Sequence, residues 1–209
     1  MKTIIKYELV INEALRSALN YDTPDEQINE FIRFFGKHIG SDRIYIFEDC
    51  DEKHVTKNTY EWCADGIVPE IHELQNVDMD IIGWWYQTFD KDRNVIITDI
   101  EQIKDEDKVS YNLLKAQNVK NLVVCPIRYK DEIKGFFGVD NPPESDTLGL
   151  TTFLDMIGTL LISLLKLRNS FTKSNKEAML SSYSSLSSIY ISMALVNVQT
   201  HRYHIVKTL

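Results

Sequence analysis

Two runs of apolar residues, separated by a short polar turn, stand in the middle of the chain. They are Leu122–Tyr129 and Ile133–Asp140, both rich in Val, Ile and Phe, and the turn between them is Lys130–Asp131–Glu132. Apolar runs bounded by turn-forming residues predict an antiparallel hairpin. Because glycine weakens a strand, Gly135 and Gly138 in the second run indicate places where another backbone or a packed helix comes close.

Before this hairpin, segments with helical spacing of apolar residues alternate with short strand-like runs. The clearest helix start is Thr23, a capping residue that is followed by Pro24 and by Glu26, which completes a capping box. The pattern predicts helices over residues 3–20, 24–39, 79–89 and 107–117, and strands over residues 43–48, 55–63 and 95–99. Together with the hairpin and a last long helix, this order predicts an α+β fold (α/β-like) with a sheet of five to six strands flanked by helices.

The last long helix begins near Thr147 and carries two apolar stripes. The first stripe has the spacing of a heptad seam and consists of Phe153, Ile157, Leu160, Leu164, Leu167 and Phe171. The second stripe consists of Leu150, Leu154, Leu161 and Leu165. A single contact with the sheet needs only one stripe, so we expect the other to pack against a partner helix in a homodimer. The alternative is a helix buried on both sides within one chain.

The chain changes character after this helix. We expect a connecting helix over residues 173–188, where apolar residues persist at helical spacing in serine-rich sequence. Ile189–Val198 and Arg202–Val206 then resemble the strands of a new hairpin, although two isolated strands are marginal in water. We therefore expect residues 189–209 to be the truncated start of a further domain, and the chain to be a fragment whose output domain is missing.

Composition narrows the range of partners and compartments. The chain has 209 residues and a net charge of −8, without a basic run, which argues against nucleic acid as a partner because phosphate binding needs clustered Lys and Arg. Its three cysteines, Cys50, Cys63 and Cys125, have no CxxC spacing. An odd count without that spacing favours a reducing cytoplasm over a disulfide framework.

Neither a signal peptide nor a membrane span is predicted. Lys6 and Glu8 interrupt the apolar start of the chain, where a signal peptide would be continuously apolar. The stretch 148–167 is mostly apolar but contains Asp155 and three threonines. It is therefore better explained as a buried helix than as a span.

Several phrases of the sequence, taken in order, resemble a GAF domain. They are RIYIFE, NTYEWC, NVIITDI and NLVVCPIRYKDEIKGFFGVDNP, followed by the long amphipathic helix. The resemblance covers about Pro24–Arg168 and is to the sensor type found in bacterial signalling proteins, ahead of diguanylate cyclase or histidine kinase output modules. It implies a GAF-type central antiparallel sheet flanked by helices, with long helices at its N- and C-terminal ends.

The resemblance also implies a division of the chain. Residues 1–22 are similar to the linker helix that often precedes such domains, and residues 23–172 correspond to the sensor domain with its C-terminal helix. Residues 173–188 form the connection, and residues 189–209 are similar to the start of a PAS-like domain.

Aromatic residues are the best candidates for a ligand pocket. The elements that enclose the pocket in GAF domains carry Trp62, Trp84 and Trp85, with tyrosines nearby. Trp84 and Trp85 are adjacent, so only one of them can face inward from a helix. The candidate ligand-binding residues are Tyr45, Trp62, Trp84, Tyr111 and Cys125. For any one of these residues, a place in an ordinary hydrophobic core is the simpler explanation.

The ligand itself is not identified by any motif. Bilin-binding relatives use a cysteine next to a histidine, and cyclic-nucleotide-binding relatives carry an Asn-Lys-Phe-Asp-Glu signature; the sequence has neither. Residues 90–101 place acidic or amide residues at calcium-loop positions but have Val95 where such a loop needs glycine, so no metal site is predicted. The cofactor therefore stays unknown.

Three functions compete on these grounds. The first is a non-catalytic cytoplasmic sensor that binds a small molecule and acts through a dimeric C-terminal helix. The second is a structural dimerisation module without a ligand. The third is a redox enzyme of the free methionine sulfoxide reductase type, which the positions of the cysteines disfavour: Cys125 lies inside a strand and Cys63 ends another, where a cysteine usually serves as a small hydrophobe.

Overall fold

The structure is a computed structural model that describes residues 2–91, 93–143 and 147–173. It divides into two compact units, Met1–Leu164 and Leu165–Leu209, which we describe separately. The sheet and the helices that cover it belong to the first unit. The expected connecting helix from residue 174 onward, and the expected hairpin at 189–209, lie outside the described residues.

The elements follow the predicted order closely. The helices are α1 (Lys2–Ala18), α2 (Pro24–Ile39), α3 (Gly83–Phe89), α4 (Lys108–Ala116) and α5 (Thr147–Lys173). The strands are β1 (Arg43–Cys50), β2 (Val55–Cys63), β3 (Val77–Asp78), β4 (Val95–Ile97), β5 (Leu122–Tyr129) and β6 (Glu132–Asp140). Two short 3₁₀-helices, Asp51–Lys53 and Ile100–Ile103, were not predicted.

The six strands of the described part of the chain join one antiparallel sheet in the order β3-β2-β1-β6-β5-β4. This confirms the predicted α+β fold with a six-stranded antiparallel sheet. The predicted hairpin β5–β6 lies within the sheet, with β6 paired to β1 on its other side. Its turn is two residues long, because Lys130 and Asp131 both adopt positive φ (49° and 63°), as in the tight turns that fit the twist of a hairpin.

The two glycines of β6 mark close approaches, as predicted. A Cβ atom on Gly135, whose φ is 140°, would lie 1.9 Å from the carbonyl oxygen of Phe47 on β1. A Cβ atom on Gly138 would lie 2.0 Å from the ring of Tyr45. The first glycine therefore admits a neighbouring backbone, and the second admits an aromatic ring.

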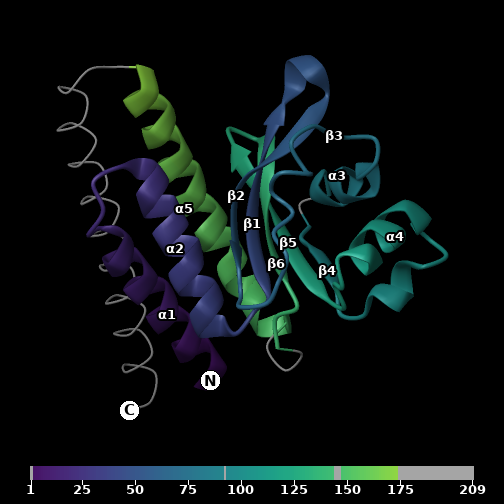
Figure 1. The fold of residues 1–209 in the computed structure, drawn as a ribbon, viewed down its shortest axis with the longest axis horizontal. Coiled ribbons are helices and arrows are strands. Elements are labelled where there is room, and N and C mark those ends of the chain that lie inside the picture. Colours follow the sequence, from purple (N-terminus) through teal and green to yellow (C-terminus); the bar gives the residue numbers. More distant parts are fainter. Residues whose placement is uncertain (1, 92, 144–146, 174–209) are drawn as a thin grey trace, which may run out of the picture. The chain divides into compact units, whose positions relative to one another are not determined.

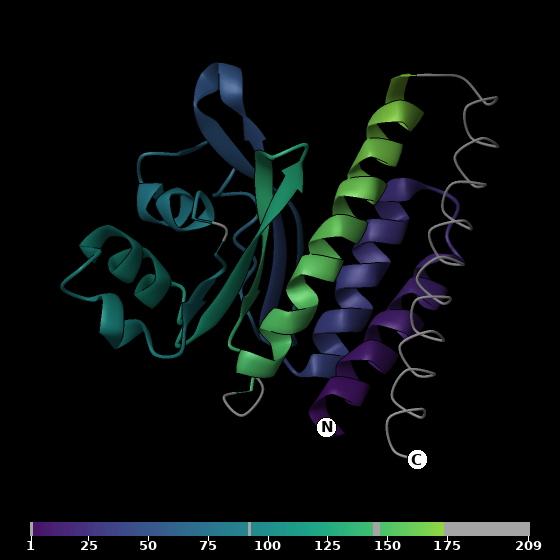
Figure 2. The same ribbon diagram turned by 180° about the vertical axis from the view of Figure 1, so that it is seen from behind.

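Helix α2 and the first part of α5 cover one face of the sheet, and α1 packs against α2 on the side away from the sheet (Figures 1 and 2). The capping box predicted at Thr23 forms: its hydroxyl oxygen accepts a bond from the Glu26 backbone N–H (3.3 Å), and the Glu26 carboxylate accepts one from the Thr23 N–H (3.1 Å). Helix α2 ends at Gly40, which has the left-handed conformation typical of a helix end.

Helix α5 packs on this face over β5. A Cβ on Gly158 would lie 3.5 Å from the Pro126 carbonyl oxygen and 3.8 Å from the Cys125 sulfur. The ring of Phe153 contacts the ring of Tyr7 on α1, with centroids 5.6 Å apart. Helix α5 therefore contacts both the sheet and another helix of the same chain.

This packing changes the interpretation of the two stripes on α5. In the first unit, side chains of both stripes are buried in the single chain: Leu150, Phe153, Leu154, Ile157, Leu160, Leu161 and Leu164. The alternative of burial on both sides accounts for these positions, so this part of the predicted dimer seam is not free to meet a partner. In the second unit, Leu167 is half-buried and Phe171 is 36% exposed.

The other face of the sheet is covered by α3, α4 and the segments around them (Figures 1 and 2). Helix α3 begins at Gly83, later than predicted, because the Asp78 carboxylate accepts a bond from the Asp80 N–H (3.0 Å) and stabilises a turn before the helix. A cluster of buried residues joins α3 and α4 to the strands, with Trp85 and Phe89 from α3 and Tyr111 and Leu114 from α4. None of the described helices is long and apolar enough to cross a membrane.

Candidate functional site

A cavity of about 40 Å³ lies between the sheet and the α3–α4 layer. We call it the aromatic cavity because four aromatic side chains line it. Its lining residues are Arg43, Tyr45, Phe47, Asn58, Glu61, Leu74, Val77, Ile82, Trp85, Leu113, Leu114, Gln117, Phe136 and Asp140. One buried water needs roughly 10–15 Å³, so the cavity accommodates about three water-sized groups.

Strand alternation decides which side chains reach this cavity. Successive residues of a strand point to opposite faces, so Arg43, Tyr45 and Phe47 of β1 share one face. Phe136 and Asp140 of β6 share the same face, since Phe136 is paired with Phe47 and Asp140 with Arg43. The rings of Phe47 and Phe136 stack with centroids 4.6 Å apart. The floor of the cavity is therefore aromatic in its middle and charged at the end where β1 begins and β6 ends.

Arg43 is the centre of the charged end. Its side chain is 4% exposed, and Nη1 donates to Oδ2 of Asp140 (3.2 Å) and to Oε1 of Gln117 (3.3 Å). Nη2 donates to the carbonyl oxygen of Val68 (2.7 Å), and Nε lies 3.4 Å from Oε1 of Glu61. One buried guanidinium thus links β1 to β6, to β2, to the end of α4 and to the segment after β2.

Glu61 fastens that segment to the sheet. Its side chain is 2% exposed, and Oε2 accepts bonds from the backbone N–H groups of Glu70 (2.9 Å) and Ile71 (3.0 Å). We call residues 64–76 the covering segment, because Leu74 lines the cavity from it. The segment is joined to β2 by a further bond from the Asn58 N–H to the Leu74 carbonyl oxygen (2.8 Å). Buried charged groups of the sheet therefore hold the cover of the cavity in place.

Burial is the largest influence on the pKa values of the ionisable groups at the charged end of the cavity. It raises the pKa of Asp140 to about 7, an effect that the charge of Arg43 only partly offsets. Burial together with the Asp140 charge raises the pKa of the Tyr45 hydroxyl well above its usual value. Burial also raises the pKa of the Cys63 thiol, against the opposing influence of Arg43. Asp140 is thus the group here that changes charge near neutral pH, whereas the thiol of Cys63 stays protonated.

Three buried polar atoms of residues that line the cavity have no hydrogen-bond partner among the described residues: Nε of Arg43, Nε1 of Trp85 and Oδ1 of Asp140. Nε of Arg43 lies 3.4 Å from the Glu61 carboxylate in an ion pair, whereas Trp85 and Asp140, which are 5% and 2% exposed, leave Nε1 and Oδ1 open. The Tyr45 hydroxyl is near enough to lower the pKa of Asp140, but it forms no hydrogen bond with Oδ1. Leaving a buried donor or acceptor unpaired costs about 1–3 kcal/mol, so both atoms favour a guest in the cavity.

A second cavity adjoins the first. It has a volume of about 300 Å³, and we call it the polar cavity. Its walls come from the covering segment, from the loop after α4 and from the sheet ends at Asp42 and Asn141. Arg43, Gln117 and Asp140 line both cavities, so these three side chains lie between them.

Of the predicted ligand-binding residues, one lines the aromatic cavity. Tyr45 does, and it is 6% exposed. Of the adjacent tryptophans, Trp85 lines the cavity, while Trp84 is partly buried against the same cluster. Tyr111 belongs to the buried cluster without lining the cavity, and its hydroxyl donates to Glu101 (2.9 Å).

Trp62 and Cys125 lie on the opposite face of the sheet. Trp62 pairs with Ile44, which is out of phase with Arg43 and Tyr45, and its ring packs against Gly36 of α2. The Cys125 sulfur lies below Gly158 of α5. These two residues therefore do not line the aromatic cavity, because strand alternation points both side chains toward the layer that contains α2 and α5.

The residues that sequence reasoning missed are Arg43, Glu61 and Asp140. A signal was present: each is a charged residue within or at the end of an otherwise apolar or aromatic strand, and Arg43 is in phase with Tyr45. A charge on an inward-facing strand position is costly unless it is paired. The partners of Arg43, which are Glu61 and Asp140, lie 18 and 97 residues from it along the chain, so the local pattern of polar and apolar residues could not predict these ion pairs.

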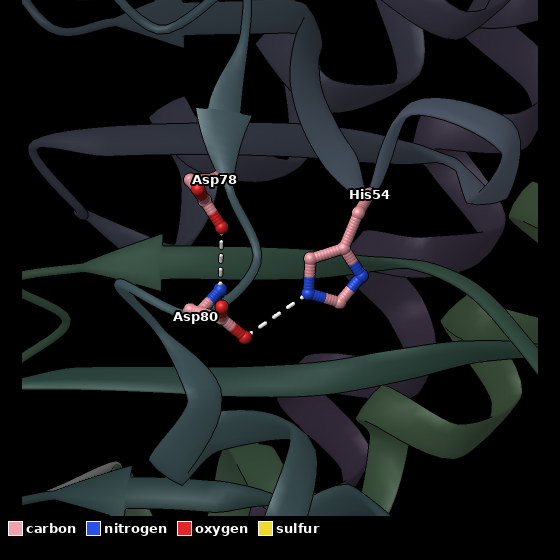
Figure 3. A group of neighbouring side chains, drawn as sticks. All are labelled: His54, Asp78 and Asp80. Carbon is pink, nitrogen blue, oxygen red and sulfur yellow. Dashed lines mark hydrogen bonds and ion pairs between the residues drawn. The ribbon is translucent and has the colours of Figure 1, made fainter.

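One group of side chains has metal-ligand chemistry within the described part of the chain. His54, Asp78 and Asp80 offer ligand atoms within 4.8 Å of one another, as Figure 3 shows. Nε2 of His54 lies 3.0 Å from Oδ1 of Asp80, and this hydrogen bond raises the pKa of the histidine. All three side chains are exposed, and the Asp78 carboxylate already serves the turn before α3. The group needs no cation to explain its geometry.

No family model matches the chain. Over 128 residues it is 26% identical to the methanogenesis regulatory histidine kinase FilI of Methanothrix harundinacea (strain 6Ac). That match spans 59% of this chain but only 14% of the kinase.

Solved structures give the fold. The GAF domain of an Acinetobacter phosphoenolpyruvate-protein phosphotransferase matches 80% of this chain and 98% of its own, with a TM-score of 0.58 and 10% identity. The phycoerythrobilin-bound GAF domain of a cyanobacterial phytochrome matches 75% of this chain and 95% of its own, with a TM-score of 0.59 and 16% identity. The chain therefore has the GAF-domain fold.

Proposed function

We propose that this chain is the sensory part of a signalling protein and that it binds a small molecule in the aromatic cavity. The observation that carries the proposal is the cavity itself, whose lining residues Trp85 and Asp140 each keep a buried polar atom, Nε1 and Oδ1, without a hydrogen bond. A closed core without a ligand would be expected to pair or exclude such atoms.

The relatives support a sensory role. The sequence relative is a regulatory histidine kinase, and a GAF domain of the same fold holds a bilin in a cyanobacterial phytochrome. A bilin is not the ligand we propose, because the sequence has no adjacent Cys–His pair and the aromatic cavity accommodates only about three water-sized groups. We propose a much smaller, polar ligand.

A route from the cavity to α5 passes through Asn141. Its side chain donates to Oδ2 of Asp42 (2.7 Å) and accepts from the N–H of Lys120 (2.7 Å). It follows Asp140 directly, and α5 begins at Thr147. We propose that occupancy of the cavity biases the position of α5 and thereby an output domain in the longer protein.

The proposed role is non-catalytic. Of the cysteines, Cys125 is buried and the Cys63 thiol has a raised pKa, which lowers the reactivity expected of a redox enzyme. We place the protein in the cytoplasm on its odd, unspaced cysteines. Homodimerisation remains a proposal, with Leu167 and Phe171 as its candidate contacts on α5.

The proposal is tested by thermal unfolding of the purified chain with a panel of small metabolites from several chemical classes. A true ligand at a hundred times its Kd adds about 2.7 kcal/mol, which corresponds to roughly 5–10 °C in Tm for a domain of this size. The matched variants are Leu74→Trp, which fills the cavity from its cover, and Val109→Trp, which changes a residue that is 56% exposed.

We expect the ligand to raise the Tm of the wild type and of Val109→Trp, and to leave Leu74→Trp unchanged. Equal shifts in both variants would place the binding site elsewhere. A panel without any stabilising compound would contradict the sensory proposal.

A further inference from the structure

The ionisable groups at the aromatic cavity are unbalanced in charge. Arg43, Glu61 and Asp140 carry the charges among its lining residues, so two carboxyl groups face one guanidinium. Glu61 is satisfied by two backbone N–H groups, and Arg43 uses both terminal nitrogens on protein acceptors. Asp140 is therefore the carboxyl group that pairs with Arg43 through Oδ2 and keeps Oδ1 without a hydrogen bond.

Of the buried atoms without a hydrogen bond, Oδ1 of Asp140 is an acceptor and Nε1 of Trp85 is a donor. Oδ1 of Asp140 accepts no hydrogen bond, and Nε1 of Trp85 donates none within the described structure. A guest that satisfies both atoms needs a donor at one end and an acceptor at the other. Both atoms belong to residues that line a cavity of about 40 Å³, so a guest with only a few heavy atoms has to carry both groups.

The walls favour a positive charge at the donor end. An anion would add a third negative charge beside Glu61 and Asp140, whereas a cation restores neutrality. Aromatic faces attract cations, and the cavity is lined by Tyr45, Phe47 and Phe136 in addition to Trp85. The stacked pair Phe47–Phe136 and the edge-on ring of Tyr45 give these walls a fixed geometry.

From these observations we infer that the aromatic cavity binds a short organic amine that carries a hydroxyl or carbonyl oxygen, with its ammonium group on Asp140 Oδ1 and its oxygen accepting from Trp85 Nε1. This inference rests on the proposed function and names the chemical class of its ligand. The small volume of the cavity limits the guest to a few heavy atoms.

A proton and an ammonium group compete for Asp140, so the affinity for the amine should depend on pH. The ammonium requires an ionised Asp140, whose pKa burial raises to about 7. The groups that face it are Arg43 and Tyr45 on β1 and Glu61 on β2, and Arg43 is the cation among them. Raising the pH from 6 to 8 therefore increases the ionised fraction about tenfold, and amine binding should tighten by the same factor, since an alkylammonium stays protonated there.

The test is a titration followed by the indole N–H resonance of Trp85 in two-dimensional NMR of the full chain. The probes are ethanolamine, its neutral analogue ethylene glycol and its anionic analogue glycolate, each at millimolar concentration. Trp85→Phe assigns the resonance among those of the three tryptophans. We expect ethanolamine to shift it and to bind at least tenfold more tightly than either analogue.

Variants locate the charge that is recognised. Asp140→Asn should weaken ethanolamine binding by roughly tenfold to a hundredfold, because it removes a charged hydrogen-bond acceptor. Asp80→Asn is the matched control at an exposed carboxylate and should leave binding unchanged. If Asp140→Asn does not fold, the wild-type titrations at pH 6 and pH 8 decide, because only a site that needs ionised Asp140 gains affinity tenfold.

The outcomes separate this inference from the proposed function. If glycolate or ethylene glycol shifts the Trp85 resonance and ethanolamine does not, the cavity is a ligand site of another class and the inference is wrong. If none of the three probes shifts the Trp85 resonance, the inference is also overturned, because the cavity then binds neither a small amine nor its neutral or anionic analogue. The sensory proposal is then judged separately by the metabolite panel and the Leu74→Trp variant.

Discussion

Asp140 shows how one residue position combines fold and chemistry. It ends β6 opposite Arg43, where the sheet needs an inward-facing residue, and it is 2% exposed. Its ion pair with Arg43 links two strands, yet one carboxylate oxygen stays unpaired at the cavity. A purely structural pair would gain nothing from this arrangement, since an unpaired buried oxygen is destabilising.

The raised pKa of Asp140 makes stability depend on pH. Burial is its largest cause, and the folded carboxyl holds its proton up to about pH 7, whereas the unfolded one loses it near pH 4. The folded state binds more protons between these values, so its stability is full below about pH 4 and falls as the pH rises to about 7. We expect this group to lower the unfolding free energy by up to roughly 4 kcal/mol over that window.

Urea unfolding of the wild type and of Asp140→Asn between pH 5 and pH 8 measures this dependence. The wild type should lose stability as the pH rises, and the asparagine variant should show a flatter profile because it has no proton to lose. Asp105→Asn, at an exposed position, serves as control and should keep the wild-type slope. Parallel profiles for the wild type and Asp140→Asn would show that Asp140 ionises normally.

Gly138 gives a prediction about packing at the cavity. A methyl group there would overlap the ring of Tyr45, 2.0 Å away, and would push that ring toward the cavity. We expect Gly138→Ala to cost about 1–3 kcal/mol, the usual cost of overpacking. Gly83→Ala is the matched control, because no heavy atom lies within 4 Å of its Cβ position, and it should change stability by less than about 0.5 kcal/mol. Equal urea midpoints for the two variants would contradict the close approach of the Tyr45 ring to β6.

At the scale of elements, local signals were enough to predict most of the fold. The capping box at Thr23 and the turn of the β5–β6 hairpin are properties of a few adjacent residues, and both formed where expected. Strand β3 was missed because it has two residues and owes its existence to pairing with β2. The face of the sheet on which a side chain lies was harder to predict than the position of the strand. Trp62 and Cys125 lie in correctly predicted strands but point away from the cavity.

Helix α5 shows the same limit. Its two apolar stripes were visible in the sequence, but what each stripe contacts depends on α1, which packs beside it through Tyr7 and Phe153. A heptad pattern cannot distinguish a partner helix of another chain from a helix earlier in the same chain. The burial of Leu160 and Leu164 within one chain favours the second explanation.

Leu160→Glu combined with Leu164→Glu distinguishes the two explanations: a seam that met a second copy would give a folded monomer, whereas a seam buried within one chain would give an unfolded protein. Two carboxylates in the core would cost several kcal/mol each, comparable with the whole stability of a domain. We expect circular dichroism to show loss of the folded state, not a folded monomer. Met156→Glu, at a position of α5 that is 39% exposed, should stay folded. A folded, monomeric double variant in light scattering would show that the seam faces a second copy.

At the scale of the whole molecule, the fold was predictable and the site was not. The order of elements and the GAF-like phrases pointed to the architecture that the solved GAF domains share. The cavity depends on contacts between residues far apart in the sequence, such as Arg43 with Asp140 and Trp85 with Phe136. Sequence spacing does not predict such contacts. A charged residue in phase with inward-facing aromatic residues of a strand does, however, indicate a buried charge that needs a partner.

Native mass spectrometry of the purified chain, after incubation with a metabolite extract, shows whether the aromatic cavity holds a small molecule. It reports the number of chains and any bound small molecule in the same spectrum. We expect a small noncovalent adduct on the wild type and on Val109→Trp that is absent from Leu74→Trp, whose larger side chain occupies the aromatic cavity. A wild-type chain that carries no adduct, or an adduct that Leu74→Trp retains, would contradict the claim that this cavity is the ligand site.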